Sequence, residues 1–165
     1  MEYWDIYDKD RNFSGKKKGK YETWYEGEYH LAAEGWIINS KKEILVQQRS
    51  QMCAILPGAW ALTTGRVIAG ETTLQGCIRE FKEELGVDVK KEELRLMDTY
   101  TKGDMIWDIY FVRKDVSLED IVLQEEEVAR VKFVDTLEFR QMLDEGIMYK
   151  YDEIYELLDF VDNQL

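Results

Sequence analysis

The sequence contains few of the residues from which disulfide frameworks, zinc sites and flexible linkers are built. Its 165 residues include two cysteines (Cys53 and Cys77), one histidine (His30) and one proline (Pro57). The cysteines form no metal-ligand pair, and a single histidine excludes a multi-histidine zinc site. No low-complexity or proline-rich stretch divides the chain. We therefore expect one domain over residues 1–165, with residues 1–30 as an N-terminal extension packed on it.

Long apolar runs and positive charge are also scarce. No run approaches the roughly 18 apolar residues of a membrane helix, and the first residues lack the pattern of a signal peptide. We therefore expect a cytoplasmic protein without membrane contact. The 34 acidic against 22 basic residues give a net charge of −12, which disfavours a nucleic-acid polymer as partner. A small phosphorylated partner stays compatible, because a bound divalent cation reverses the local charge.

The apolar pattern predicts an α+β fold with helices packed against a mixed sheet. A polar stretch at residues 8–20 predicts a hairpin or long loop. We expect strands at residues 30–39, 43–48, 59–64, 94–101, 105–113 and 128–135. We expect helices at residues 72–85, 137–144 and 152–162, the first starting at Thr72 or Thr73 and ending at Gly86.

The predicted helix 72–85 carries three glutamates at close spacing. Glu80, Glu83 and Glu84 occupy an arc that is expected to face away from an apolar stripe formed by Leu74, Cys77, Ile78, Phe81 and Leu85. Three such carboxylates repel one another unless a cation lies between them, and Mg²⁺ or Mn²⁺ prefers oxygen ligands. By themselves they are more typical of a solvated acidic surface.

The residues around these glutamates decide between the two interpretations. Gly65 is followed after five residues by Glu71, and after seven more by the run Arg79-Glu80-Phe81-Lys82-Glu83-Glu84-Leu85-Gly86-Val87. This pattern resembles the Nudix box, GX5EX7REUXEEXGU, at all seven fixed positions, with Phe81 where U is more often aliphatic. The resemblance implies a Nudix fold, an αβα sandwich with a mixed sheet that carries the box as a loop–helix–loop.

The resemblance also implies a metal-dependent hydrolase that cleaves a diphosphate linkage, with Mg²⁺ or Mn²⁺ as cofactor. The expected metal ligands are Gly65, Glu80, Glu83 and Glu84. Gly65 and Gly70 would bend the chain sharply and bring backbone carbonyls near the metal.

Other residues of the motif are expected to support the chemistry. Arg79 can hold Glu71 by a two-pronged hydrogen bond, and Glu71 and Gly86 are structural members of the motif. We expect catalytic roles for Arg79 and for Glu83 or Glu127, of which one glutamate is the general base. Glu127 is chosen from residues 125–127 because it adjoins an apolar strand, although this segment is equally typical of a solvated acidic turn.

A second resemblance covers most of the chain and points to the Nudix branch related to isopentenyl-diphosphate isomerase. It rests on the segments WDIYDKDRN, GEYHLAAEGWI, QQRS, PGAWALTTG and EEEVARVKFV. That isomerase requires a cysteine and a histidine after the PG-x-W element, and residues 60–66 contain neither. His30 resembles one metal-binding histidine of the isomerase, but without a second histidine we expect a structural role. The alternatives to a hydrolase are an isomerase-like enzyme and a Nudix protein that binds without catalysis.

Three residues are candidates for binding the substrate, which we expect to be a small-molecule diphosphate such as a nucleoside diphosphate derivative. Arg49 and Arg66 can contact phosphates, and Trp107 can stack on a ring. Trp36 and Trp60 could also stack on a base, and each of the three tryptophans is more typical of a core. Homodimers are common in the family, so a homodimer is an expectation that the resemblance brings.

Overall fold

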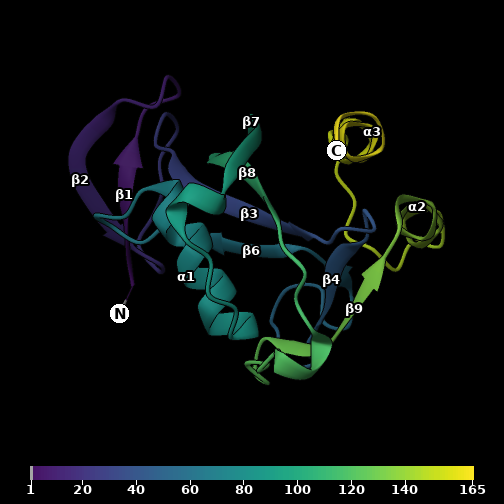
Figure 1. Cartoon of the computed structure of the whole chain (residues 1–165). Coiled ribbons are helices and arrows are strands. Elements are labelled where there is room, and N and C mark those ends of the chain that lie inside the picture. The colour runs from purple at the N-terminus through teal and green to yellow at the C-terminus, as the bar shows by residue number, and fades with distance from the viewer. Residues whose placement is uncertain (1) are drawn as a thin grey trace.

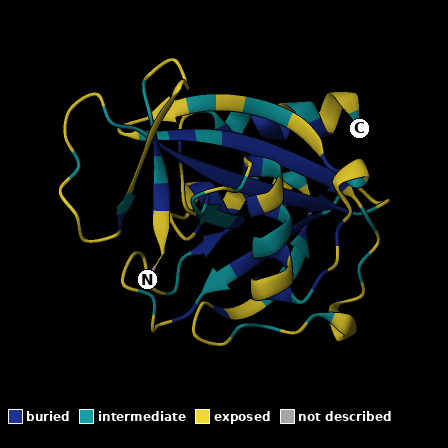
Figure 2. Cartoon of the chain, turned by 90° about the vertical axis from the view of Figure 1, so that its left-hand side faces the viewer, coloured by how far each residue is buried: buried dark blue, intermediate teal, exposed yellow. Residues whose placement is uncertain are grey.

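The centre of the sheet is β3 (His30–Ile38), whose sequence is a nearly unbroken apolar run. Every residue of β3 is buried, as expected for a strand covered on both faces. In the computed structural model, which describes residues 2–165, β3 pairs in parallel with β8 (Met105–Arg113), so that His30 lies opposite Met105 and Ile38 opposite Arg113. Figure 2 shows the buried strands passing through the middle of the molecule, with exposed residues mostly on peripheral loops.

The remaining strands extend the sheet on both sides of this parallel pair. On one side, β7 (Arg95–Lys102) is antiparallel to β8. On the other side, β3 is flanked by β4 (Ile44–Arg49) and by β6 (Thr63–Arg66), while β5 (Trp60–Ala61) and β9 (Val128–Val134) pair with β4. The sheet is mixed, as predicted.

One predicted strand is wrong in its extent. Residues 59–64 were expected to form a single strand, but β5 ends at Ala61 and β6 begins at Thr63. The reason is that β5 pairs with β4 whereas β6 pairs with β3, so the chain changes partner at Leu62. This change continues the chain along β3 to Gly65 and Arg66.

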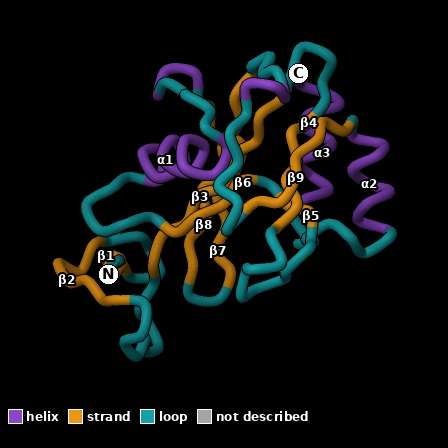
Figure 3. The backbone as a smooth tube through the Cα atoms, turned by 90° about the horizontal axis from the view of Figure 1, so that it is seen from below, coloured by secondary structure: helices purple, strands orange, loops and turns teal. Residues whose placement is uncertain are grey.

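Helices cover both faces of the sheet (Figures 1 and 3). The helix α1 (Thr73–Leu85) packs on one face, and α2 (Thr136–Asp144) and α3 (Ile154–Gln164) pack on the other. Short 3₁₀ turns lie at Lys91–Glu93 and Leu118–Asp120. Each side has its own buried core, one including Trp36, Phe139 and Leu158 and the other including Ile37 and Phe81. The architecture is therefore α+β, in three αβα layers.

The boundaries of α1 follow from its capping residues, as the sequence predicted. The Thr72 side chain accepts a hydrogen bond from the Gln75 N–H (3.1 Å), and the Gln75 side chain accepts one from the Thr72 N–H (2.9 Å). The helix ends at Gly86, which adopts the left-handed conformation with φ 67°.

The expectation that all three box glutamates face away from the core is wrong. Glu84 is only 8% exposed, and the Glu80 side chain is 14% exposed, whereas the Glu83 side chain is 50% exposed. The buried face of α1 is centred on Thr73, Cys77 and Phe81 rather than on the stripe through Leu74 and Ile78, which are only partly buried. Glu80 therefore lies against β6 and Glu84 against β4.

The helix α1 can pack this close to the sheet because β3 contains Gly35. A Cβ at this position would overlap the ring of Phe81, so only glycine permits this close packing.

The N-terminal strands β1 (Tyr3–Tyr7) and β2 (Phe13–Gly19) form a separate two-stranded hairpin. Of the two alternatives predicted for residues 8–20, a hairpin or a long loop, the hairpin is confirmed. Arg11 in its turn donates two hydrogen bonds to the buried carboxylate of Asp108 on β8 (2.8 and 2.5 Å). Burial raises the pKa of Asp108, but hydrogen bonds from Arg11, Thr73 and Thr99 outweigh it, so the pKa lies below its ordinary value. This ion pair fixes the hairpin to β8, and the Thr73 hydroxyl links the same carboxylate to the start of α1. Among residues 2–165, no helix is both long and apolar enough to cross a membrane.

Candidate active site

Arg79 connects the parts of the glycine- and glutamate-rich motif. Its guanidinium donates to both carboxylate oxygens of Glu71 (2.9 and 3.1 Å), which confirms the predicted two-pronged bond. It also donates to Glu80 (2.8 Å), to Glu83 (3.2 Å) and to the backbone carbonyl of Arg66 (3.1 Å). One cation thus ties the loop before α1, the helix itself and β6 into a single unit.

Gly65 has a different structural role from the one predicted. It lies inside β6 rather than in a sharp bend, and the turn with positive φ is at Gly70 (φ 89°). A Cβ on Gly65 would overlap the carboxylate of Glu80. Glycine is therefore needed at this position because it lets a carboxylate of α1 approach the backbone of β6.

Glu84 is the most buried carboxylate of the motif. Its Oε2 accepts a hydrogen bond from the Gln47 side chain (2.5 Å), and the Gln47 Oε1 accepts one from Thr63 (2.8 Å). Burial, together with the neighbouring carboxylates of Glu80 and Glu127, raises the pKa of Glu84 to about 8 despite the Gln47 bond. Burial also raises the pKa of Glu80, although Arg79 opposes the shift. The cluster therefore has less positive charge nearby than its carboxylates require.

A divalent cation fits this cluster chemically, although the side chains do not yet converge on one point. Within residues 2–165, no group of three acidic, histidine or cysteine side chains is arranged to hold a metal ion. The reason is that Arg79 holds Glu80 and Glu83 while Gln47 holds Glu84. Hard oxygen donors, raised pKa values and the space left by Gly65 are the features expected where a cation would replace these contacts.

The structure brings Glu127 to the same end of α1. The Gln124 N–H donates to the Glu84 carbonyl (3.0 Å), and the Ser50 N–H donates to the Glu127 carbonyl (2.9 Å). Glu127 is exposed, and its charge helps to raise the pKa of Glu84. Both candidate bases, Glu83 and Glu127, therefore lie in reach of solvent beside the buried glutamates.

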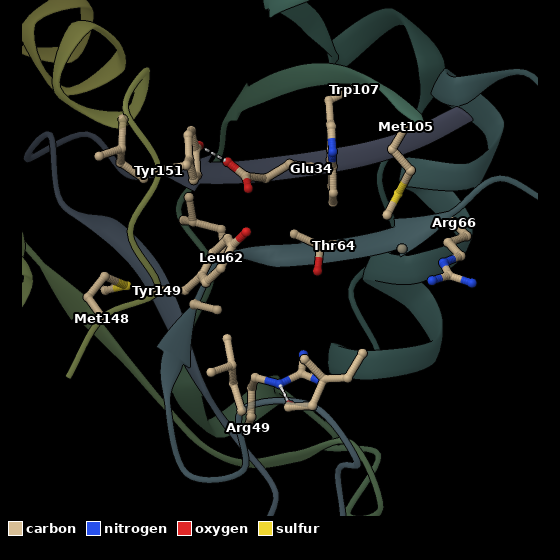
Figure 4. A pocket seen from close by; sticks show the side chains of 15 residues that line it. Glu34, Arg49, Leu62, Thr64, Arg66, Met105, Trp107, Met148, Tyr149 and Tyr151 are labelled. Carbon is tan, nitrogen blue, oxygen red and sulfur yellow. Dashed lines mark hydrogen bonds between the residues drawn. The ribbon is translucent and has the colours of Figure 1, made fainter. Parts of the chain in front are cut away.

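A pocket of about 280 Å³ opens next to this acidic cluster (Figure 4). Its lining includes all three residues predicted to bind substrate, Arg49, Arg66 and Trp107. Gly65 also lines it, so this one residue borders both the pocket and the Glu80 carboxylate. Trp36 and Trp60 are buried in the core, as expected.

The sequence reasoning missed Glu34 and Tyr151, which also line this pocket. Glu34 is 2% exposed and receives hydrogen bonds from the Trp36 indole N–H (2.8 Å) and the Tyr151 hydroxyl (2.5 Å). One signal was available, because Glu34 is a charged residue in the middle of the apolar run that forms β3. Nothing in the sequence indicated Tyr151, which is 117 positions away from Glu34.

His30 lies away from the pocket lining, between two tryptophans. Its ring is 5.5 Å from the ring of Trp4 and 4.8 Å from that of Trp24, both edge-on. Burial and the nearby Arg66 lower its pKa to about 4, against a smaller opposing effect of Asp104, 3.9 Å away. A neutral ring packed between aromatic residues agrees with the structural role expected for it.

Two findings come from comparison with known families and proteins. The family model of the NUDIX domain matches residues 28–157. An uncharacterised Nudix hydrolase of Listeria monocytogenes is 33% identical over 160 residues, which cover 96% of this chain and 95% of the relative.

Two solved structures share the fold. A Deinococcus radiodurans protein superposes with a TM-score of 0.77 at 17% identity, over 98% of both chains. A bifunctional NMN adenylyltransferase/ADP-ribose pyrophosphatase of Francisella tularensis, complexed with AMP and a manganese ion, has a TM-score of 0.61 at 20% identity, over 82% of this chain and 42% of that one.

Proposed function

Because the chain belongs to the Nudix family and is a Nudix hydrolase, we propose that it cleaves the diphosphate linkage of a nucleoside diphosphate derivative or a similar small molecule, with Mg²⁺ or Mn²⁺ as cofactor. The observation that carries the proposal is the position of Gly65. It borders the acidic cluster through Glu80 and the pocket through its own backbone. A substrate whose organic group fills the pocket therefore has its diphosphate beside the carboxylates.

In this proposal the acidic cluster holds the cation. The ligands are the carboxylates of Glu80, Glu83 and Glu84 and the backbone carbonyl of Gly65. The bound cation would supply charge neutralisation at the phosphate oxygens and would lower the pKa of the attacking water. Arg79 touches Glu71, Glu80 and Glu83, so it acts as a positioning residue that orients the ligands.

The chain's own groups would perform the remaining steps. Arg49 and Arg66 line the pocket and supply positive charge for the phosphates, and Trp107 offers a flat apolar surface for a ring. The oxygen of water attacks one phosphorus, and the bridging P–O bond breaks. Glu83 or Glu127 accepts the proton of the water, and the displaced phosphate group carries away the bond's electron pair.

The Francisella structure shares the fold over 42% of its chain and is complexed with AMP and a manganese ion, which agrees with the proposed nucleotide substrate and divalent cofactor. This agreement concerns only the class of ligand. The choice of ligand for this chain rests on the residues of its own pocket.

The test is hydrolysis of a panel of nucleoside diphosphates, nucleoside triphosphates and nucleoside diphosphate sugars, with and without Mg²⁺ or Mn²⁺. The full chain is compared with Glu84→Gln and with Glu92→Gln, a control at an exposed glutamate outside the cluster. We expect metal-dependent release of phosphate or nucleotide, lost in Glu84→Gln and kept in Glu92→Gln. Failure of every substrate together with no binding of either metal would contradict the proposal, as would conversion of isopentenyl diphosphate to its isomer.

A further inference from the structure

Glu34 is a buried carboxylate that has no cationic partner among the described residues 2–165. It lies in the central strand β3 and its hydrogen-bond donors, the Trp36 indole and the Tyr151 hydroxyl, are both neutral. Burying a carboxylate in such surroundings is costly, and an apolar residue would pack there at lower cost. The fold therefore has no structural need for an acid at this position.

The two oxygens of Glu34 have different surroundings. Both neutral donors bind Oε1, so that Oε2 accepts no hydrogen bond within residues 2–165. The fully enclosed polar side-chain atoms that lack a partner belong to Trp4 and His30, so Oε2 of Glu34 is not one of them. Figure 4 shows the second oxygen of Glu34 directed into the pocket, above Leu62 and Thr64.

The surroundings of this oxygen are flat and apolar. Trp107 and Tyr151 supply aromatic surfaces, and Leu62, Met105 and Met148 supply aliphatic ones. A volume of about 280 Å³ lies just below the ~300–1,000 Å³ typical of ligand pockets, so the pocket suits one small ring system better than a dinucleotide. A carboxylate acceptor in such a pocket fixes the orientation of a ring that carries a donor.

We propose that Glu34 is the specificity residue of this pocket, and that its Oε2 accepts a hydrogen bond from an N–H group of a nucleobase. The inference rests on the proposed function for the position of the diphosphate, and it narrows the substrate class to nucleotides. An isoprenoid chain would fill the same apolar walls but would leave Oε2 facing hydrocarbon, so the pocket rejects it.

The second half of the proposal is that Glu34 acts on binding and not on the chemical step. Its carboxylate contacts Trp36 and Tyr151 rather than the cluster around Arg79. A change at Glu34 is therefore expected in KM, with kcat nearly constant.

The experiment measures binding, so that its outcome does not depend on catalysis. Binding of the four common nucleoside monophosphates and of isopentenyl diphosphate is measured by isothermal titration calorimetry. The nucleotide that binds most tightly is then compared with an analogue whose base is methylated at the N–H groups of its Watson–Crick edge. Both ligands are titrated into the wild type, Glu34→Gln and Glu34→Leu, and into Asp108→Asn as a buried carboxylate outside the pocket. Thermal melting establishes that each variant is folded.

We expect the wild type to bind at least one nucleotide, and methylation to weaken that binding at least about 10-fold. In Glu34→Gln, Oε1 keeps its two donors and an NH₂ group replaces the free acceptor, so the unmethylated base binds about 10-fold more weakly and methylation costs less than about 3-fold. Asp108→Asn binds as the wild type does.

Equal binding of the nucleotide and its methylated analogue by the wild type would overturn the inference. This comparison uses only the wild-type protein, so it does not depend on the folding of a variant. Tighter binding of isopentenyl diphosphate than of any nucleotide would overturn it as well. Nucleotide binding that depends on Glu34 in a protein without hydrolase activity would instead uphold this inference while contradicting the proposed function.

Discussion

The acidic cluster on α1 and the pocket beside it each contain a buried glutamate with a raised pKa, Glu84 in the cluster and Glu34 in the pocket. The causes of the two shifts differ. At Glu84, burial is reinforced by neighbouring carboxylates, and the pKa rises to about 8. At Glu34, burial acts without any nearby acid, hydrogen bonds from Tyr151 and Trp36 oppose it, and the pKa rises to about 7. The first situation is relieved by a cation, and the second by a hydrogen-bond donor. The difference explains why two adjacent sites with buried carboxylates would bind different parts of one substrate.

The largest effect is expected from breaking the acidic cluster. Replacing Glu84 by Gln removes a metal ligand, so kcat/KM should fall about 10³-fold, since a cation supplies several kcal/mol of charge stabilisation to the reaction. Steady-state kinetics measures the loss. Thermal melting supplies a second measure, because Mg²⁺ should raise the Tm of the wild type and not that of the variant. An equal Mg²⁺-dependent rise in both proteins would exclude Glu84 as a ligand.

A second change breaks the link between the two regions. Gly65→Ala places a methyl group where the Glu80 carboxylate lies, so Glu80 must move away from β6. We expect about 100-fold lower kcat/KM, because displacement of a catalytic group by about 1 Å has effects of this size. Gly76→Ala is the matched control, since the nearest atom to a Cβ there is a side-chain carbon of Val67 at 3.3 Å, and no atom is overlapped. If both variants keep wild-type activity, the close approach at Gly65 has no part in the reaction.

A smaller effect is expected when the cation that organises the cluster is changed but its charge is kept. Arg79→Lys cannot form the two-pronged bond with Glu71 while also reaching Glu80 and the Arg66 carbonyl. Residues that orient metal ligands typically contribute 10- to 100-fold, and we expect about 10-fold in kcat/KM with weaker Mg²⁺ binding. An unchanged metal affinity in titrations with Mn²⁺ would argue against a positioning role.

The pH dependence of stability gives a test at Glu34 without any ligand. Its pKa is raised on folding, so between about pH 4.5 and 7 the unfolded chain loses this proton while the folded one keeps it. The wild type should therefore lose stability relative to Glu34→Gln as the pH rises through this range, by at most about 3 kcal/mol. The groups that face Glu34, the phenols of Tyr100 and Tyr151 and the thiol of Cys77, stay neutral there because burial raises their pKa values.

Urea unfolding of both proteins at several pH values measures this difference. A free-energy difference that stays constant from pH 4.5 to 7 would show that Glu34 ionises as readily in the folded protein as in the unfolded one. The upper limit assumes full burial, and residual access through the pocket would reduce it.

The sequence by itself determined what is local. The spacing of Gly65, Glu71, Arg79 and the three glutamates predicted the family and the reaction class, because these residues follow one another along the chain from β6 through the next loop into α1. Thr72 and Gly86 fixed the helix ends for the same reason, since a cap acts on the adjacent turn. The periodicity of the apolar residues was sufficient for most strands.

Only the tertiary structure decided which side chains are buried and which distant residues meet. The helical stripe suggested that Glu84 faces solvent, but contact with Gln47 of β4 places it inside. Gly65 was predicted to bend the chain, whereas the packing of α1 on β6 gives it the role of a spacer. The pocket joins β3, β6, β8 and residues 148–154, and the Glu34–Tyr151 contact spans 117 positions. Burial is a property of the whole sheet and its helices, so a carboxylate in an apolar run shows its function only after folding.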